Sequence, residues 1–179
     1  MSVRDSVIAT LTEWQAPDPD QDTLRHAVLA FTLARTDSCV RECEPGHITA
    51  SVAVLDSDGT QVLLTLHPRL GRWVQLGGHC EPGDPDIVAA ALREGLEESG
   101  LDALTMDPEL VAIHVHPLTC SLGRPTRHLD LQFTATAAPG AAIAISDESL
   151  DLRWWPVNAL PPDTDHALAY LVRRAAGRP

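Results

Sequence analysis

The sequence predicts an α+β fold in which a mixed β-sheet lies between helices. Segments with the two-residue alternation typical of strands recur along the chain. Helical patterns with a 3.6-residue period occur near the start, in the middle and at the end. Such an order of elements is typical of helices packed on the faces of a sheet. At 179 residues, the chain is expected to form one core, with room for a small appendage.

Two helices are expected at the N-terminus. Residues 3–14 and 22–35 carry apolar side chains at helical spacing, and residues 16–20, which include two prolines, separate them. We therefore predict a helical extension over residues 1–37 and the main domain over residues 38–179. The extension could be a dimer contact, which would make the protein a homodimer, a lid, or a cover for a sheet edge. The sequence does not choose among these roles.

Five later stretches have the alternation of strands. They are residues 48–55, 61–67, 110–120, 128–138 and 151–157. Residues 73–76 lead from the second of these strands directly into a glycine-rich loop. Residues 102–108 are expected to form a loop, and the last helix is expected over residues 167–174, begun by Asp163 or Asp165.

Residues 77–101 combine that glycine-rich loop with an acidic helix, which is expected to begin at Pro85. Apolar residues form one stripe of the helix, and Glu94, Glu97 and Glu98 project from the other side at i, i+3 and i+4 spacing. Three like charges at this spacing repel one another. Because carboxylate oxygens suit Mg²⁺ or Mn²⁺, the cluster predicts a site for a hard divalent cation.

This stretch resembles the Nudix box, G-x₅-E-x₇-R-E-U-x-E-E-x-G-U, in which U is a bulky aliphatic residue. Residues 93–101 match the second half of the pattern in register, and Gly78 fits its opening glycine. Asp84 replaces the box glutamate, and eight rather than seven residues separate it from Arg93. This pair of changes resembles compensation, a shorter carboxylate with one added residue. Gly95 replaces an aliphatic residue at a cost of about 1 kcal/mol in helix propensity, and could let the helix lie close to the sheet.

The resemblance implies an α/β/α sandwich and a hydrolase for a diphosphate bond in a nucleoside diphosphate joined to another group. It implies a small-molecule, nucleotide-type substrate such as an ADP-sugar or a nucleoside triphosphate. Mg²⁺ or Mn²⁺ would be held by Glu94, Glu97, Glu98 and the Gly77 carbonyl. Arg93, one turn before Glu97, can hold that carboxylate in place.

Other charged residues extend the predicted site. Glu94 could take the proton of the attacking water. In many Nudix relatives, an acidic residue shortly before a tryptophan-containing strand is an extra metal ligand or the base; Glu148 is the matching position, with Asp147 as the near alternative. A solvated acidic turn explains both equally well. Arg69 and Arg72 could neutralise substrate phosphates, or they could be exposed loop cations.

The spacing of cysteine and histidine residues suggests a possible zinc site. Cys39-x₃-Cys43-x₃-His47 offers three potential zinc ligands, but the spacing is not that of a standard zinc knuckle. Free thiols in a reducing cytoplasm explain the cysteines more simply.

The two strands after the box carry a further polar group. His114 and His116 face one side of their strand, and His128 and Asp130 are likewise two residues apart on the next strand. They could coordinate a second metal, although imidazole matches a hard ion poorly. They could equally be polar residues on the open side of a half-buried sheet.

Composition argues against two classes of partner, nucleic acids and membranes. The formal net charge is −12, and all 13 basic residues are arginine, which disfavours nonspecific binding to nucleic acid or to an anionic membrane. No apolar run approaches the ~20 residues of a membrane span, and the polar N-terminus does not resemble a signal peptide. The sequence therefore predicts a cytoplasmic protein.

Two other functions fit the same fold. A ligand-sensing module is one, but the box of such modules decays, whereas Arg93 and the glutamates are intact here. An isoprenyl-diphosphate isomerase is the other, because such enzymes use cysteine, histidine and glutamate, and His79 and Cys80 lie in the loop. The signature SQPWPFPxS of NADH-cleaving relatives is absent. Pro117, sixteen residues after Leu101, weakly resembles ADP-ribose hydrolases.

Overall fold

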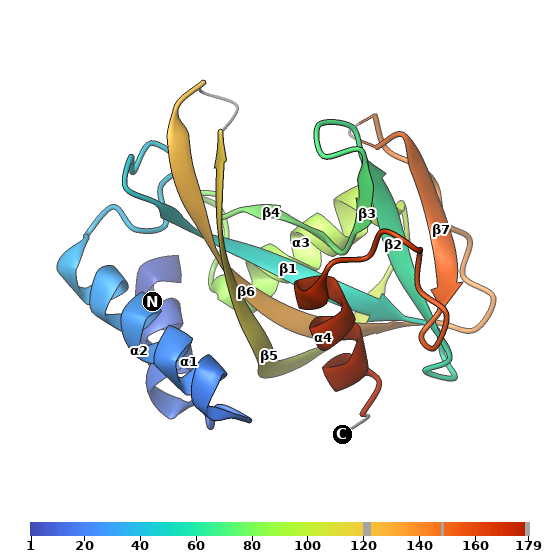
Figure 1. Cartoon of the computed structure of the whole chain (residues 1–179), viewed down its shortest axis with the longest axis horizontal. Coiled ribbons are helices and arrows are strands. Elements are labelled where there is room, and N and C mark those ends of the chain that lie inside the picture. The colour runs from blue at the N-terminus through green and yellow to red at the C-terminus, as the bar shows by residue number, and fades with distance from the viewer. Residues whose placement is uncertain (120–122, 148, 178–179) are drawn as a thin grey trace.

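The computed structural model describes residues 1–119, 123–147 and 149–177, and within these ranges it shows a seven-stranded mixed sheet flanked by helices (Figure 1). The elements are α1 (Val3–Glu13), α2 (Pro19–Ala34), β1 (His47–Leu55), β2 (Gln61–His67), β3 (Arg72–Val74), β4 (Leu76–His79), α3 (Ile87–Ser99), β5 (Leu104–Thr119), β6 (Pro125–Ala137), β7 (Asp151–Pro156) and α4 (His166–Ala175). The predicted α+β class is confirmed. None of the helices in the described part of the chain has the length and apolar character needed to cross a membrane.

The sheet is built around β1. Its main path runs β3-β2-β1-β6-β5, and β1 pairs in parallel with β6 along the whole length of β1, from the pair His47–His128 to the pair Leu55–Thr136. On the other edge of β1, residues 49–52 pair with β4. β2 therefore pairs with β1 only at Val54 and Leu55, the last two residues of β1. β2 is then free to pair with β3 and β7. The glycine-rich β4 therefore lies in the middle of the molecule.

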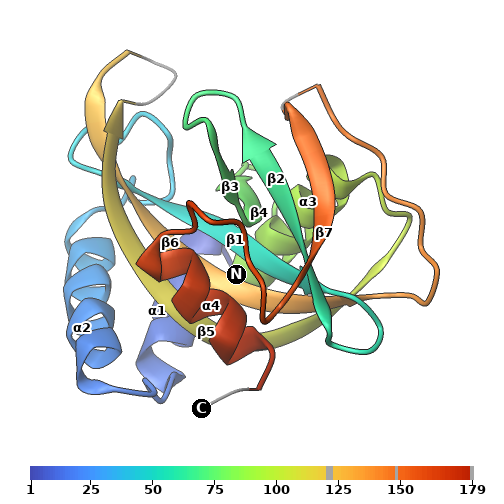
Figure 2. The ribbon, with the colours of Figure 1, turned by 45° about the vertical axis from the view of Figure 1, so that its right-hand side comes forward.

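Helices cover both faces of this sheet, with α3 behind β1 and α4 in front of it (Figure 2). Gly95 lets α3 approach closely, because a Cβ at this position would lie 2.9 Å from Val52 Cγ1 and 3.1 Å from Leu104 Cδ1. The proposed reason for this glycine is confirmed. On the opposite face, α4 buries Leu168 and Leu171 against apolar residues of β1 and β2. The two sets of contacts fix β1 between two layers.

The N-terminal helices cover an edge of the sheet. β5 is the last strand of the main path, and the Gln21 side chain binds the backbone along its outer edge as a further strand would. The Gln21 amide donates to the Ile113 carbonyl at 3.1 Å and accepts from the Ile113 N–H at 2.7 Å. Arg4 joins the two helices by donating to the Thr32 carbonyl near the end of α2 at 2.8 Å. Among the roles left open by the sequence, the edge cover is the one that these contacts show.

Three local predictions differ from the structure. α3 begins at Ile87 rather than at Pro85, because the Asp86 side chain caps it by accepting from the Ala89 N–H at 2.8 Å. Part of the predicted glycine loop is strand β4, paired with β1. Residues 104–107, expected as a loop, begin β5, because they pair with the far end of β6 before an irregularity in the register.

Candidate active site

The acidic side of α3 faces β4, and its three glutamates differ in exposure. The Glu94 side chain is 13% exposed and that of Glu97 is 60% exposed, whereas Glu98 as a whole residue is 9% exposed. The helix thus presents two largely buried carboxylates and one at the surface. Burial of a carboxylate is costly unless it is paired or hydrogen-bonded, so the partners of these groups decide what the site can hold.

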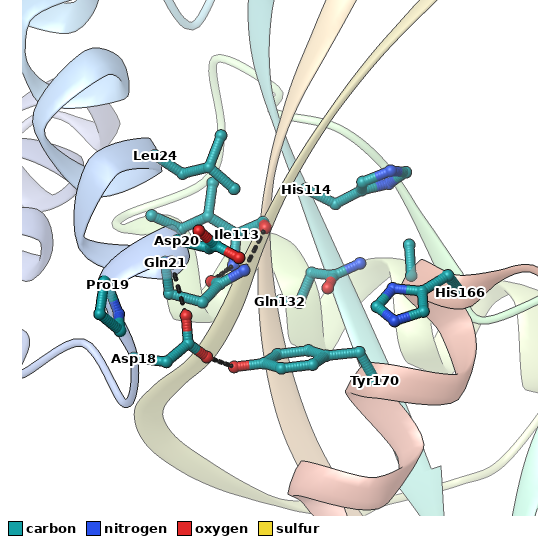
Figure 3. A pocket seen from close by; sticks show the side chains of 11 residues that line it. Asp18, Pro19, Asp20, Gln21, Leu24, Ile113, His114, Gln132, His166 and Tyr170 are labelled. Carbon is teal, nitrogen blue, oxygen red and sulfur yellow. Dashed lines mark hydrogen bonds between the residues drawn. The ribbon is translucent and has the colours of Figure 1, made fainter.

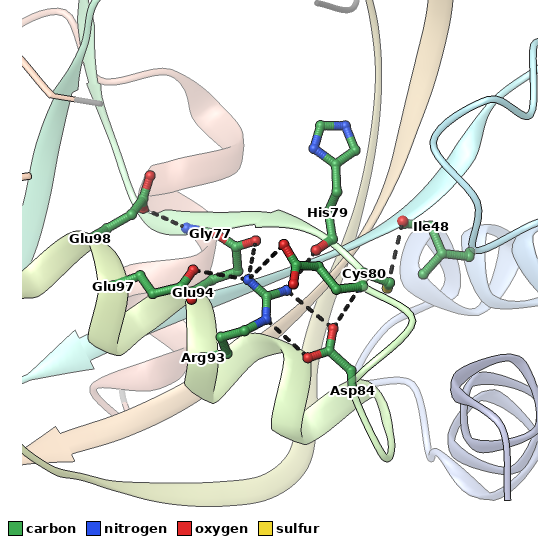
Figure 4. Close-up of polar contacts among 10 residues, drawn as sticks. Ile48, Gly77, His79, Cys80, Asp84, Arg93, Glu94, Glu97 and Glu98 are labelled. Carbon is green, nitrogen blue, oxygen red and sulfur yellow. Dashed lines mark hydrogen bonds and ion pairs between the residues drawn. The ribbon is translucent and has the colours of Figure 1, made fainter. Parts of the chain in front are cut away.

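Two glycines of β4 receive the buried carboxylates. The Gly77 N–H donates to Glu98 Oε2 at 2.9 Å. A Cβ on Gly78 would lie 2.7 Å from the carboxylate of Glu94, so any other residue at this position would displace that carboxylate. Gly77 has a φ of 153°, and a Cβ there would lie 2.6 Å from the Ser51 Cα of β1. Consecutive glycines therefore bring the β4 backbone against both α3 and β1 (Figure 4).

Arg93 connects the carboxylates to one another. Its Nη1 atom donates at 3.0 Å both to Glu94 Oε1 and to Glu97 Oε2, and its Nη2 atom donates to the His79 carbonyl at 2.8 Å. The side chain is only 21% exposed. Hydrogen bonds from a guanidinium to carboxylates are about twice as strong as neutral ones. Arg93 therefore fixes two glutamates of α3 relative to the end of β4.

Asp84 binds the remaining side of the same guanidinium. Its oxygens accept from Arg93 Nε at 3.0 Å and from Nη2 at 3.1 Å, and its side chain is 5% exposed. Burial raises the pKa of Asp84, but the bonds from Arg93 and from the Glu81 N–H outweigh burial and lower it. The aspartate at this variant position of the box, with its one added residue, thus reaches the arginine with both oxygens.

The two arginines predicted to bind substrate occupy different environments. Arg69 is exposed in the turn between β2 and β3. Arg72 is half-buried at the start of β3, where its Nη2 atom lies 3.1 Å from Asp165 Oδ2. Its Nε is buried and has no hydrogen-bond partner among the described residues. Arg72 thus has an N–H donor without a partner among the described residues, whereas Arg69 lies in a turn and not in a strand of the sheet.

The acidic pair before β7 is described only in part. Glu148 lies outside the described residues, and Asp147 is exposed in a turn. The role of either residue as a metal ligand or base remains a prediction.

The histidines and cysteines group differently from their order in the sequence. His47 does not combine with Cys39 and Cys43 into a metal-ligand group among the described residues; it approaches His79 and His128 instead. Each pair of these three rings has a centroid separation of 5.0 Å.

The three cysteines in the described residues are free thiols. Cys39 hydrogen-bonds with Cys80, and this bond, together with burial, raises the pKa of the Cys80 thiol. A thiol held in this way gives no support to the cysteine chemistry of an isomerase.

The predicted polar face of β5 and β6 is present. His116 pairs in register with His128, and His114 pairs with Asp130. Asp130 is 4% exposed and accepts from the hydroxyls of Thr49 at 2.9 Å and of Ser51 at 2.6 Å. These bonds tie Asp130 to β1, so it acts as a buried hydrogen-bond acceptor in the middle of the sheet. His114 and His116 do not join a metal-ligand group within the described residues.

The same face opens into a pocket of about 490 Å³ between the start of α2 and the start of α4 (Figure 3). Its lining includes Ile113 and His114 of β5 and His166 of α4. Two of the lining residues are joined, because the Tyr170 hydroxyl donates to Asp18 Oδ2 at 2.6 Å. None of the box glutamates contributes to its lining, so this pocket and the carboxylates of α3 are separate features.

Comparison with known proteins gives the family. The family model of the NUDIX domain matches residues 45–175, which is more than two thirds of the chain and contains the whole box. The chain belongs to the Nudix family. The first two helices lie outside the matched range. The predicted membership of the Nudix hydrolase family is confirmed.

Individual relatives agree with this family. The chain is 32% identical over 117 residues to the NAD-capped RNA hydrolase NudC of Pseudomonas fluorescens, a match that covers 64% of this chain and 39% of that protein. The chain thus spans about two fifths of the length of that relative. Among solved structures, an Ap4A hydrolase of C. elegans superposes with a TM-score of 0.56 at 20% identity, covering 73% of this chain and 95% of the other. A UDP-X diphosphatase superposes with a TM-score of 0.56 at 15% identity over 99% and 97% of the two chains.

Proposed function

We propose that this Nudix protein is a Mg²⁺-dependent hydrolase that cleaves a diphosphate bond in a nucleotide-type substrate. The observation that carries the proposal is the seating of Glu94 and Glu98 against the consecutive glycines Gly78 and Gly77. The carboxylates of Glu94 and Glu98 lie beside two consecutive glycines, and Glu97 projects from the same side of α3. Together they form a set of hard oxygen ligands. Such ligands suit Mg²⁺ or Mn²⁺ better than softer metals.

The residues present fit such an ion. Glu94, Glu97 and Glu98 would hold it together with the Gly77 carbonyl, and the glycine at position 78 leaves the space that a Cβ would fill. The three carboxylates have different partners: Arg93 binds those of Glu94 and Glu97, and the Gly77 N–H binds that of Glu98. When bound, the ion would neutralise diphosphate oxygens and make nearby water more acidic.

Each side chain then has a role in the hydrolysis. A water oxygen forms a bond to phosphorus, the bridging phosphorus–oxygen bond breaks, and the proton of the water passes to a carboxylate oxygen of Glu94 or Glu148. Arg93 keeps Glu94 in position through its Nη1 atom. Arg72, with its spare buried Nε donor, would bind a phosphate oxygen of the substrate, and Arg69 would approach from the neighbouring turn.

The substrate class is a nucleoside diphosphate linked to another group, of the ADP-sugar or nucleoside triphosphate type. The matched relative is an NAD-capped RNA hydrolase, but this chain lacks the SQPWPFPxS signature that follows the box in NADH-cleaving relatives. For this reason, we do not extend that substrate to the chain. The strongly negative net charge also disfavours a polyanionic substrate such as RNA.

A substrate panel tests the proposal. The purified chain is incubated with Mg²⁺ and with ADP-sugars, nucleoside triphosphates, a dinucleoside polyphosphate, NAD-capped RNA or an isoprenyl diphosphate, and released phosphate and monophosphate are measured. We expect release from at least one nucleotide, its loss in EDTA, and a loss of at least about a hundredfold in Glu98→Gln. Release from no nucleotide would favour a sensor, and turnover of the isoprenyl substrate alone would favour an isomerase. Either result would overturn the proposal.

A further inference from the structure

Three imidazoles with buried Nε2 atoms converge on one face of the sheet, apart from the acidic helix. They are His47 at the start of β1, His79 at the end of β4 and His128 in β6. Strand register explains their meeting: His47 pairs directly with His128, and Thr49, two residues further along β1, pairs with His79. Because residues two apart share a face, all three rings project to the same side of the sheet.

The geometry of the three rings is close to that of a metal site. Each pair of ring centroids is separated by 5.0 Å, and one ring nitrogen from each histidine lies within 4.8 Å of the other two. With a zinc–nitrogen bond of about 2.0–2.1 Å, a centroid lies about 3.2 Å from the ion, so tetrahedral ligation places centroids about 5.2 Å apart. An ion would need only small side-chain rotations to draw the nitrogens to bonding distance.

Unsatisfied nitrogens give an independent reason for a ligand. The Nε2 atoms of His47, His79 and His128 are all buried and lack a hydrogen-bond partner among the described residues. His47 as a whole is only 1% exposed. Buried polar atoms without partners are rare, so three at one point indicate a missing partner.

The electronic state of the rings also suits a cation. The Nδ1 atom of His47 lies 3.5 Å from the Cys43 carbonyl, a long contact that favours a proton on Nδ1 and leaves the Nε2 lone pair available. Burial lowers the pKa of His79 to about 4 and that of His128 to about 3, so both rings are neutral at pH 7. The positive charge of Arg41 adds to burial in lowering the pKa of all three rings.

We propose that His47, His79 and His128 form a site for one divalent transition-metal ion of the zinc type, separate from the carboxylate site of α3. Three neutral nitrogens suit Zn²⁺, Co²⁺ or Ni²⁺, whereas Mg²⁺ prefers oxygen ligands. A fourth position remains for water or an anion. The ion joins β1, β4 and β6, and it stabilises the end of β4 two residues beyond Gly77.

Cobalt binding tests this site directly. Metal-free protein comprising all 179 residues is titrated with CoCl₂, and the visible d–d absorption of four-coordinate Co²⁺ is recorded, followed by displacement with ZnCl₂. We expect one equivalent to bind with the spectrum of a nitrogen-ligated, four-coordinate ion. At a hundredfold excess over its Kd, Zn²⁺ should raise the Tm by roughly 5–10 °C. Absence of the spectrum in folded protein would overturn the site.

Variants then locate the ion. His128→Gln and His79→Gln should each weaken Co²⁺ binding by at least about a hundredfold, because even residues that only orient a ligand contribute ten- to a hundredfold. Two variants serve as controls: His116→Gln removes a ring whose centroid is 5.3 Å from that of His128 but which lies outside the trio, and His26→Gln removes an exposed histidine of α2. Both should retain the spectrum.

A final variant separates this site from the carboxylates. Glu98→Gln should leave the Co²⁺ spectrum unchanged, because Glu98 belongs to the other site. Loss of the spectrum in Glu98→Gln, or its persistence in His128→Gln and His79→Gln, would place the ion elsewhere and overturn the proposal. The wild-type titration decides the existence of the site even where a histidine variant fails to fold.

Discussion

The contacts of Arg93 predict that Arg93→Lys destabilises the protein and weakens its activity. The guanidinium makes two bonds to Asp84 and one each to the His79 carbonyl, Glu94 and Glu97, at distances from 2.8 to 3.1 Å. A lysine keeps the charge, but its single nitrogen cannot reach acceptors on opposite sides of the planar fork. At least two of the five bonds should therefore be lost.

The size of the effect follows from burial. One lost bond leaves an oxygen of Asp84 unsatisfied in a side chain that is only 5% exposed, and bonds to charged groups contribute about 1.5–3 kcal/mol each. The contact with Glu97, which is 60% exposed, adds less than about 1 kcal/mol. We expect the free energy of unfolding to fall by about 3 kcal/mol. For a chain of this length, the Tm should fall by about 6–12 °C.

Urea denaturation measures this loss as a fall in the midpoint at an unchanged m-value. The matched control is Arg153→Lys, because Arg153 is 62% exposed and pairs with Asp151 at the surface, where a change within about 0.5 kcal/mol is expected. Asp84→Asn combined with Arg93→Lys should cost at least about 1 kcal/mol less than the sum of the single variants. Equal midpoints for Arg93→Lys and Arg153→Lys would refute the reasoning.

Three further results are expected. Gly78→Ala should lower kcat at least about tenfold with little change in Tm, because its Cβ would meet the Glu94 carboxylate at 2.7 Å; an unchanged kcat would argue against this seating. Gly95→Ala should lower the free energy of unfolding by about 1 kcal/mol, since strain against Val52 exceeds the gain in helix propensity; a more stable variant would contradict the close approach. In metal-free protein, the folded-state pKa of His128 is about 3 and the unfolded value is near 6.5, so the unfolded state binds the proton first. Stability, measured by urea denaturation in EDTA, should therefore decrease as the pH falls from about 6.5 to about 4, and His128→Gln should reduce that slope by up to about 1.4 kcal/mol per pH unit; an equal slope in both proteins would refute the shift.

Features that depend on local spacing could be predicted from the sequence. The periodicity of the N-terminal helices, the alternation of the long strands and the glutamate spacing of α3 each depend on neighbours within a few residues. Gly95 is an instructive case, because its helix-weakening character indicated a close approach that the structure contains. The same reasoning failed for β4, since glycines 77 and 78 resemble a loop but form a strand.

The histidine site could not be predicted because it depends on strand register. His47, His79 and His128 come from three strands, and their proximity follows from the parallel pairing of β1 with β6 and the antiparallel pairing of β1 with β4. Sequence spacing instead grouped His47 with Cys39 and Cys43. No local pattern encodes which strands pair and in which register. Side chains that meet across a sheet are therefore visible only in three dimensions.

The central claim is that the acidic side of α3 and the glycines of β4 hold a hard cation that positions a diphosphate. A crystal of the protein soaked in MnCl₂ tests it most directly through the anomalous signal of manganese. We expect a peak between the carboxylates of Glu94 and Glu98, beside the Gly77 backbone. A map with manganese only at the three histidines, or with no peak next to α3, would contradict the account.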